Sequence, residues 1–378
     1  MNKVKICTIL GTRPEIIRLS RIIKKLEENV DHTLIHTGQN YDYELNEVFF
    51  NELELKKPDF FLNSAKKSNS PITTIANMFS ELDIILDKIS PDAVLILGDT
   101  NSALSSIVVK RKKIPLFHME AGNRCFDDRV PEEINRRLVD HISDINLTYS
   151  DIAREYLLLE GFPKERIIKT GSPMYEVLEY FRDNIENSSI LSTLKVKEKK
   201  FFLVSCHREE NIDDDKKFTE FISFLKFLTK NYDIPTLIST HPRTLSKIKK
   251  QKIKFNSKIK ICKPFGFIDY IKLQKSAKLV FSDSGTINEE SSILDFPALN
   301  IREAHERPEG MEEAAAMMVG FNLRIIKNAI NVIELQAINK EKNSMIVSDY
   351  SKPNVSSKVL KIILSHIDYV NREIWKKN

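Results

Sequence analysis

The stretch VKICTILGTRPEIIRLSR, residues 4–21, contains the unit from which the fold can be predicted. A continuous apolar run is followed by Gly11, then by Pro14 at the expected first position of a helix, and then by apolar residues at helical spacing. An apolar run without alternation is typical of a parallel strand that is covered on both faces. The stretch therefore predicts a strand, a tight turn and a helix in succession.

The same alternation recurs along the 378-residue chain, which is longer than one hydrophobic core usually serves. Further apolar runs occupy residues 32–37, 93–98, 114–119, 201–206, 234–240, 259–263, 277–283 and 297–302. Strand signals lapse in the polar stretch RDNIENSSILSTLKVKEKK, residues 182–200. We expect an α/β protein with one domain over residues 1–174 and a second over 201–351. A C-terminal helix within 352–378 is expected to cross back onto the first domain.

Composition excludes several classes of protein. The net charge is only +5, from 58 basic and 53 acidic residues, and the lysines are spread along the chain, so no nucleic-acid partner is expected. Four cysteines without CxxC or zinc-type spacing indicate reduced thiols and no metal site. No apolar run approaches the roughly 20 residues that span a bilayer. These features predict a cytoplasmic protein with no membrane partner.

Glycines indicate where a ligand would bind. Half of the ten follow expected strands: Gly11, Gly38, Gly98, Gly122 and Gly285. Open parallel sheets bind ligands at the carboxyl ends of their strands. The glycines therefore predict one cleft lined from both domains.

The stretch SDSGTINEE, residues 282–290, is the strongest local signal for a phosphate. Ser284 and Gly285 are expected at the start of a helix, where free N–H groups and the positive dipole end suit an anion. Glu289 or Glu290 could then accept hydrogen bonds from a ribose diol. An ordinary capped helix start with acids in its first turn explains the same letters. The stretch is not a GxxxxGK[ST] loop, and no GxGxxG follows the first strand.

The first strand–helix turn offers a cation for the same ligand. Arg13 lies where a guanidinium could hold a diphosphate, although a surface arginine is the alternative. Arg18 and Arg21 could lie on the exposed face of the helix and need no role.

Three acids and one histidine lie where proton transfer could occur. Asp99 follows the apolar run 93–98 and could act as a base or cap the next helix. His207 follows another expected strand, where a structural role is the alternative. Glu120 follows a strand and Glu132 begins the helix VPEEINRR, an arrangement suited to acid and base catalysis. Pairs at i,i+4 within that helix are the alternative for Glu132, but they cannot explain Glu120.

Eight motifs occur in the order known from one family. GTRPE, TGQ (37–39), GDT (98–100), HMEAG, PEEINR, CHREEN, SDSGTINEE and RPEG (307–310) resemble the non-hydrolysing UDP-N-acetylglucosamine 2-epimerases over nearly the whole chain. The resemblance implies two Rossmann-like domains in a glycosyltransferase-B arrangement, with the active site in the cleft between them. It also implies a UDP-sugar substrate, no cofactor or metal, elimination of UDP to a 2-acetamidoglycal, and re-addition.

The resemblance assigns roles to particular residues. Its catalytic acids match Asp99, Glu120 and Glu132, and its active-site histidine matches His207. Its nucleotide contacts match Arg13, Ser284, Gly285 and Glu290. Arg18 stands where the family has a lysine. A homodimer is expected.

The loop EAGNRCFDDRVPEE, residues 120–133, departs from the commonest pattern of the family. It resembles the branch that converts UDP-2-acetamido-2,6-dideoxy-L-talose to UDP-N-acetyl-L-fucosamine for surface and capsule polysaccharides. Cys125 and Phe126 could then contact the 6-deoxy methyl group. The alternatives are a UDP-N-acetylglucosamine 2-epimerase, a retaining glycosyltransferase of the same fold and a non-catalytic binder. TGQNYDYEL, residues 37–45, lacks the second glutamine of the commoner branch, so no substrate activation is expected.

Overall fold

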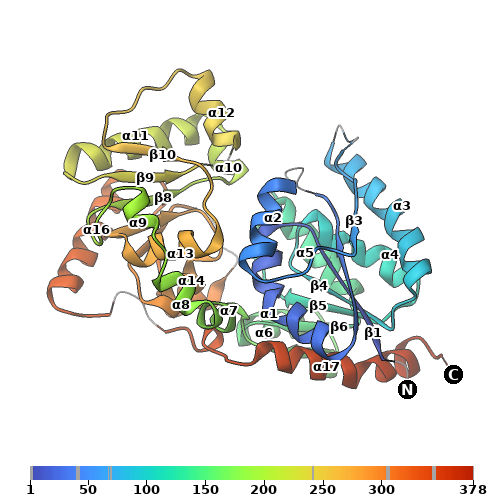
Figure 1. Cartoon of the computed structure of the whole chain (residues 1–378). Helices are drawn as coiled ribbons and strands as arrows, with labels where there is room; N and C mark the ends of the chain where they lie inside the picture. Colours follow the sequence, from blue (N-terminus) through green and yellow to red (C-terminus); the bar gives the residue numbers. More distant parts are fainter. Residues whose placement is uncertain are drawn as a thin grey trace. The chain divides into compact units, whose positions relative to one another are not determined.

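The structure is a computed structural model that describes residues 3–39, 43–66, 68, 70–240, 242–303, 307–342 and 346–377. The chain divides into two compact units, Met1–Glu179 with Asp349–Asn378 and Tyr180–Ser348 (Figure 1). We refer to them as the first and the second domain.

The first domain is built on a parallel sheet in the order β3-β2-β1-β4-β5-β6-β7. Its strands are β1 (Lys5–Leu10), β2 (Asp31–His36), β3 (Phe60–Phe61), β4 (Ala93–Leu97), β5 (Leu116–Ala121), β6 (Ile145–Thr148) and β7 (Ile167–Lys169). All residues of β4 and β5 are buried, as the uninterrupted apolar runs predicted.

The helices that connect these strands begin with recognisable sequence signals. They are α1 (Arg13–Asn29), α2 (Tyr43–Glu52), α3 (Pro71–Ile89), α4 (Ser106–Arg111), α5 (Pro131–Ile142), α6 (Asp151–Leu159) and α7 (Met174–Tyr180), with short helices η1 (Asn101–Ser105) and η2 (Lys164–Arg166). Proline lies in the first turn of α1, α3 and α5, where its missing N–H costs no helical hydrogen bond. The Ser150 hydroxyl caps α6 by accepting from Ala153 N.

The second domain repeats the same topology with a parallel sheet in the order β10-β9-β8-β11-β12-β13. Its strands are β8 (Phe202–Ser205), β9 (Thr236–Ser239), β10 (Ile259–Cys262), β11 (Leu279–Ser282), β12 (Ala298–Asn300) and β13 (Met317–Met318). Its helices are α8 (Arg182–Glu186), α9 (Ile190–Thr193), α10 (Glu209–Ile212), α11 (Asp215–Asn231), α12 (Pro242–Lys250), α13 (Phe267–Ser276), α14 (Ile287–Leu294), α15 (Pro308–Glu312) and α16 (Leu323–Ile338).

Both sheets therefore have the Rossmann strand order, and the predicted α/β class is confirmed. In this order the chain reverses direction across the sheet between β1 and β4, and again between β8 and β11. Such switch points leave a crevice at the carboxyl ends of the strands, where ligands bind. The nine expected strands are all present, and β3, β6, β7 and β13 add to them.

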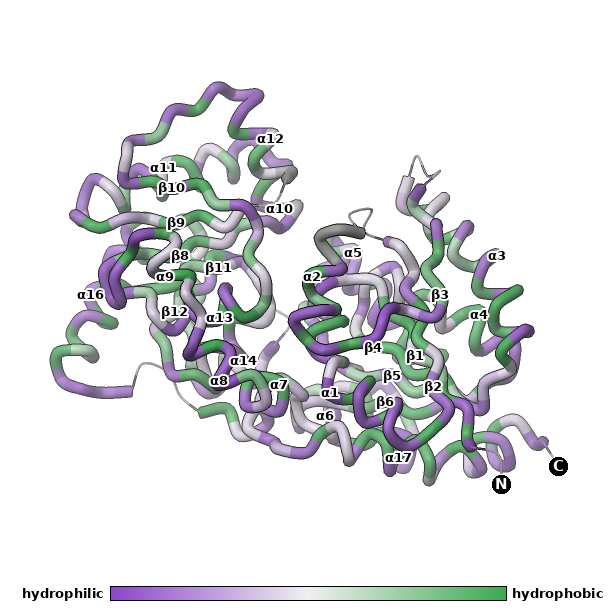
Figure 2. Tube along the Cα trace, viewed as in Figure 1, coloured by the Kyte–Doolittle hydropathy of each residue, from purple (hydrophilic) through white to green (hydrophobic). Residues whose placement is uncertain are grey.

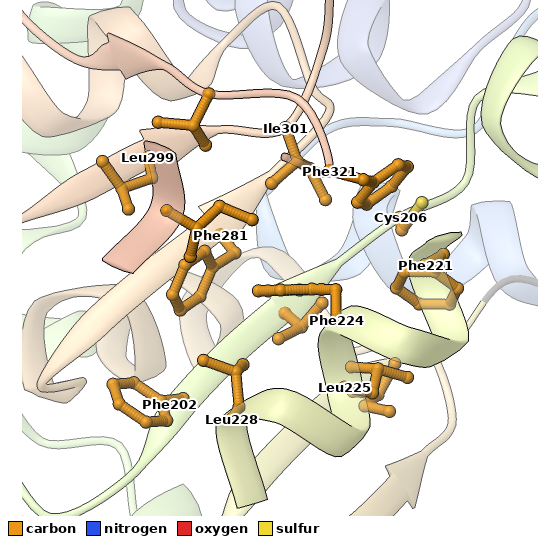
Figure 3. Packing of buried hydrophobic residues seen from close by; sticks show 14 of the residues in the cluster. Phe202, Cys206, Phe221, Phe224, Leu225, Leu228, Phe281, Leu299, Ile301 and Phe321 are labelled. Atoms are coloured by element: carbon orange, nitrogen blue, oxygen red, sulfur yellow. The ribbon is translucent and has the colours of Figure 1, made fainter. Parts of the chain in front are cut away.

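Aromatic packing stabilises the second domain. Phe224 of α11 meets Phe281 of β11 edge-on, with ring centroids 4.9 Å apart, and Phe202 of β8 lies 5.8 Å from Phe281 (Figure 3). These rings are fully buried, and edge-to-face pairs add about 1 kcal/mol beyond their area. The strands of both domains are hydrophobic along most of their length (Figure 2).

The C-terminal segment belongs to the first domain. Helix α17 (Val355–Tyr369) packs against α1, and it is continued by η4 (Val370–Ile374) after the short η3 (Ser348–Tyr350). Ser356 N donates to Glu176 Oε2 at 2.8 Å, which ties the start of α17 to α7. Among the described residues, no helix is long and apolar enough to cross a membrane.

Candidate functional site

A buried glutamate lies at the switch point, at the carboxyl edge of the first sheet. Glu15 of α1 accepts from Gly11 N at 2.6 Å and Thr12 N at 3.1 Å, and from Thr100 Oγ1, beyond β4, at 2.6 Å. Burial raises the pKa of Glu15 to about 7, although these hydrogen bonds oppose the shift. A Cβ on Gly11 would lie 2.0 Å from Thr37 Oγ1, so only glycine allows this close turn. Glu15 thus joins the ends of β1 and β4.

Glu120 lies at a strained position at the end of β5. The pairing of β5 with β6 shifts register between Met119 and Ala121, and Glu120 has φ 65°, a conformation that favours glycine. Its carboxylate is buried and lies 2.5 Å from Arg18 Nη1 of α1. Strain of this kind is often found at functional sites. The bulge directs the carboxylate onto a buried cation.

A buried network holds the chain on both sides of this bulge. His118 Nε2 lies 2.8 Å from the Gly98 carbonyl oxygen, and its Nδ1 lies 2.9 Å from Asp140 Oδ1. Asp140 also accepts from Gly122 N at 3.1 Å and from Arg124 Nη1 at 2.7 Å. Burial raises the pKa of Asp140, but His118 and Arg124 outweigh it and lower the pKa overall. The network fixes the backbone around Glu120.

Asp99, directly after β4, is held by a buried arginine. Arg136 of α5 donates from Nε at 3.0 Å and from Nη2 at 2.6 Å to Asp99 Oδ2. Its Nη1 donates at 2.9 Å to Glu133, so one guanidinium serves two carboxylates. The cap of the next helix is Thr100, whose side chain accepts from Ser102 N, so the alternative that Asp99 caps that helix is wrong.

Glu132 and Glu133 begin α5 but have different surroundings. Glu133 is fully buried and accepts from Cys125 N at 3.0 Å and Phe126 N at 3.2 Å, so it orders the loop that precedes the helix. Arg137 donates to Glu133 at 2.9 Å, which is one of the expected i,i+4 pairs. Glu132 is half-buried in the first turn. Glu133 is therefore structural, and Glu132 is the acid that remains partly exposed.

Two arginines of α1 are buried, contrary to the sequence-based expectation. Arg18 and Arg21 were expected on the exposed face, but their exposed fractions are only 6% and 7%. Arg18 is the buried cation of Glu120, so an amphipathic pattern alone misplaced it. Arg13, the first residue of α1, is half-buried, and its Cζ lies 5.8 Å from the centre of the Phe49 ring.

In the second domain, His207 and Asp283 meet across the switch point. His207 follows β8 and Asp283 follows the neighbouring strand β11. Asp283 is fully buried, and its Oδ1 lies 3.0 Å from His207 Nδ1. Burial raises the pKa of Asp283, but the charge of His207 and hydrogen bonds from His207, Arg208 and Asn211 hold it well below the usual range. Sequence reasoning did not single out Asp283.

Ser284 and Gly285 lie in the turn that leads into α14, as expected. Ser284 Oγ lies 2.9 Å from Thr286 Oγ1, and Thr286 is the N-cap of the helix. Glu290 accepts from Gln274 Nε2 at 2.6 Å. Glu289 is fully buried and pairs with Arg307 at 2.7 Å, so its role is structural and not ribose binding. Among the described residues, no group of three or more His, Cys, Asp or Glu side chains could hold a metal.

Comparison with known proteins identifies the family. A sequence profile for UDP-N-acetylglucosamine 2-epimerase matches residues 24–364. The structure of UDP-N-acetylglucosamine 2-epimerase from Rickettsia bellii is 47% identical, with a TM-score of 0.92 over 100% of both chains. That of the Methanocaldococcus jannaschii enzyme, in complex with UDP-GlcNAc and UDP, is 33% identical with a TM-score of 0.88, covering 96% of this chain and 100% of that chain.

A third relative acts on a different sugar. The UDP-2,3-diacetamido-2,3-dideoxy-D-glucuronate 2-epimerase of Pseudomonas aeruginosa is 31% identical over 322 residues, which is 84% of this chain and 88% of that protein. Fold and sequence together define the class as an isomerase with two Rossmann-like domains. The chain belongs to the UDP-N-acetylglucosamine 2-epimerase family.

Proposed function

We propose that the protein epimerises C2 of a UDP-2-acetamido sugar without a cofactor. A carboxylate removes the C2 proton, the C1–O bond to UDP breaks, and a C1=C2 double bond forms in a 2-acetamidoglycal. UDP then adds back to C1 while C2 is protonated on the opposite face. The observation that carries the proposal is the strained Glu120 carboxylate held against Arg18 at the carboxyl edge of the first sheet. Asp99 and Glu132 supply the further proton-transfer groups this reaction needs.

The second domain supplies most of the nucleotide contacts in this proposal. Ser284, Gly285 and the start of α14 hold phosphate oxygens, and Glu290 accepts from the ribose. Arg13 of the first domain adds a cation for the diphosphate, and His207 takes up a proton at Nε2 and then stabilises charge on the departing UDP as a cation. The Methanocaldococcus jannaschii complex with UDP-GlcNAc and UDP supports a UDP-sugar as the ligand.

For the substrate we propose UDP-2-acetamido-2,6-dideoxy-L-talose, with UDP-N-acetyl-L-fucosamine as the product. Support comes from the loop between Glu120 and Glu132, where Phe126 is 65% exposed and its ring meets Tyr156 edge-on at 5.4 Å. An exposed ring offers apolar contact to a methyl group. The alternative is UDP-N-acetylglucosamine, which the 47% identity to the Rickettsia bellii enzyme favours. The Pseudomonas aeruginosa relative supports variation of the sugar within the family.

The two substrates are distinguished by kcat/KM for each UDP-sugar. We expect a preference for the 6-deoxy sugar that falls by about 10-fold in Phe126→Ser, because a methyl contact is worth roughly 1–3 kcal/mol. Leu159→Ser changes an 85% exposed apolar side chain in the same domain and is the matched control. A preference for UDP-N-acetylglucosamine that Phe126→Ser leaves unchanged would reject the fucosamine assignment. Transfer of the sugar to an acceptor with C2 untouched would instead indicate a glycosyltransferase.

Two further properties are part of this proposal. We expect hyperbolic kinetics without substrate activation, although residues 40–42 of the stretch on which this depends lie outside the described residues. We also expect a homodimer. Light scattering tests the second property, and a monomer at micromolar concentration would contradict it.

A further inference from the structure

We propose that Asp283 is a positioning residue that fixes the ring tautomer of His207. The inference rests on the proposed role of His207 in the reaction. It concerns a contact within the second domain, at the switch point of the sheet.

The two side chains are brought together by adjacent strands. Ser205 of β8 pairs with Ser282 of β11, so the next residues of each strand leave the sheet side by side. Asp283 N donates to the Ser205 carbonyl oxygen at 3.1 Å, which fixes the Asp283 backbone to β8. The His207 ring is 42% exposed, whereas the Asp283 carboxylate beneath it is fully buried. A partly exposed imidazole therefore lies against a fully buried carboxylate.

The two carboxylate oxygens of Asp283 have separate contacts. Oδ2 accepts from His207 N and Arg208 N, both at 2.9 Å, and from Asn211 Nδ2 at 3.1 Å. Oδ1 lies 3.0 Å from His207 Nδ1. The Oδ2 contacts order the turn after β8, as any structural aspartate would. The Oδ1 contact adds nothing to that turn and acts on the ring alone.

The charge of Asp283 determines which ring nitrogen carries the proton. An ionised carboxylate only accepts hydrogen bonds, so Oδ1, which lies 3.0 Å from Nδ1 of His207, favours the ring form with its proton on Nδ1. In the neutral ring, Nε2 then keeps its lone pair. Two other titratable side chains lie near this pair. Arg208 follows His207 in the sequence. Tyr270 of α13 is a neutral phenol, because burial and the charge of Glu290 raise the pKa of Tyr270.

Asp283→Asn is expected to invert this arrangement. The turn needs an acceptor where Oδ2 lies, because three donors point there, so the amide oxygen of asparagine takes that place. The amide NH₂ then faces Nδ1 of His207 and can only donate. Nδ1 must accept and Nε2 must carry the proton, so Nε2 can no longer take up a proton during the reaction.

Nitrogen-15 NMR of histidine-labelled protein measures the tautomer directly. We expect His207 to be the Nδ1–H form in the wild type and the Nε2–H form in Asp283→Asn. Asn211→Ala removes one donor from Oδ2 but leaves the ring contact, so it should keep the Nδ1–H form and serves as the control. An Nε2–H ring in the wild type would overturn the proposal, and this measurement remains decisive if Asp283→Asn fails to fold.

Kinetic measurements distinguish a positioning role of Asp283 from a purely structural one. Asp283→Asn should lower kcat by about 100-fold with KM within a few fold, and should cost nothing further in a His207→Ala background. Equal losses in both backgrounds would show that Asp283 does not act through His207. A wild-type protein with the expected tautomer but no epimerisation of either UDP-sugar would reject the proposed function and leave the Asp283–His207 pairing intact.

Discussion

The two domains share one strand order but arrange charge at their carboxyl edges in opposite ways. In the first domain, Asp99 follows β4 and Glu120 lies at the end of β5, and buried arginines hold both in place. In the second domain, the carboxylate of Asp283 is buried, and a partly exposed imidazole lies above it. One edge therefore presents carboxylates, and the other presents an imidazole. The same topology can thus supply proton transfer and anion binding from different side chains.

The largest expected effect tests the first half of this comparison. Glu120→Gln, Asp99→Asn and Glu132→Gln should each lower kcat by about 10³-fold, because each removes a proton-transfer group. Affinity for UDP should stay within a few fold, since the proposed nucleotide contacts are other residues. Turnover assays and calorimetry measure the two quantities. Variants that keep turnover and lose UDP affinity would reverse the roles of the two domains.

Removing the cation beneath Glu120 should destabilise the first domain. Arg18→Met leaves a buried carboxylate without its partner, and breaking such a pair costs about 3 kcal/mol in the free energy of unfolding. Arg18→Lys keeps the charge and should cost less. Urea denaturation measures both variants. Equal stability of Arg18→Met and wild type would mean that the Glu120 carboxylate is not held as a buried ion.

The pH dependence of stability should report Glu15. Its pKa is raised from 4.5 to about 7, so the folded protein binds this proton more tightly than the unfolded chain does. The stabilisation is complete below pH 4.5 and is lost as pH rises to about 7. Over that window, wild type should lose about 2 kcal/mol relative to Glu15→Gln, which carries no titrating proton. Parallel stability curves for the two proteins would show that Glu15 is already ionised when folded.

The smallest expected effect tests the second domain. Ser284→Ala should weaken UDP binding by about 10-fold and leave kcat unchanged, because it removes one neutral hydrogen bond. Ser223→Ala, on the exposed face of α11, is the matched control. Calorimetry with UDP compares the two variants. If both bind UDP like wild type, the turn before α14 is an ordinary capped helix start.

Sequence patterns predicted the fold and the places where site residues lie, but not their partners. Buried parallel strands are continuous apolar runs that can be recognised locally, so most of the strands were found. Among the strands that were missed, β3 and β13 have only two residues each, which is too short for a recognisable apolar run. Asp99 and His207 could be located because both directly follow an apolar strand.

Long-range pairing was not visible in the sequence. Arg18 and Glu120 are separated by 102 positions, and amphipathic spacing treats an arginine as a surface residue. Asp283 had a usable signal, since it follows a buried strand just as Asp99 does. It contacts His207, which is 76 positions away in the sequence, and this contact depends on which strands are neighbours in the sheet. The catalytic and nucleotide-binding roles stay predictions.

Turnover in deuterated water tests the central claim, that this protein removes and returns the C2 proton while UDP departs. Either UDP-sugar is incubated with the protein in D₂O and followed by NMR. We expect solvent deuterium at C2 of the epimerised product and slow release of free UDP with a glycal. Epimerised product that keeps all of its C2 protium would contradict the account.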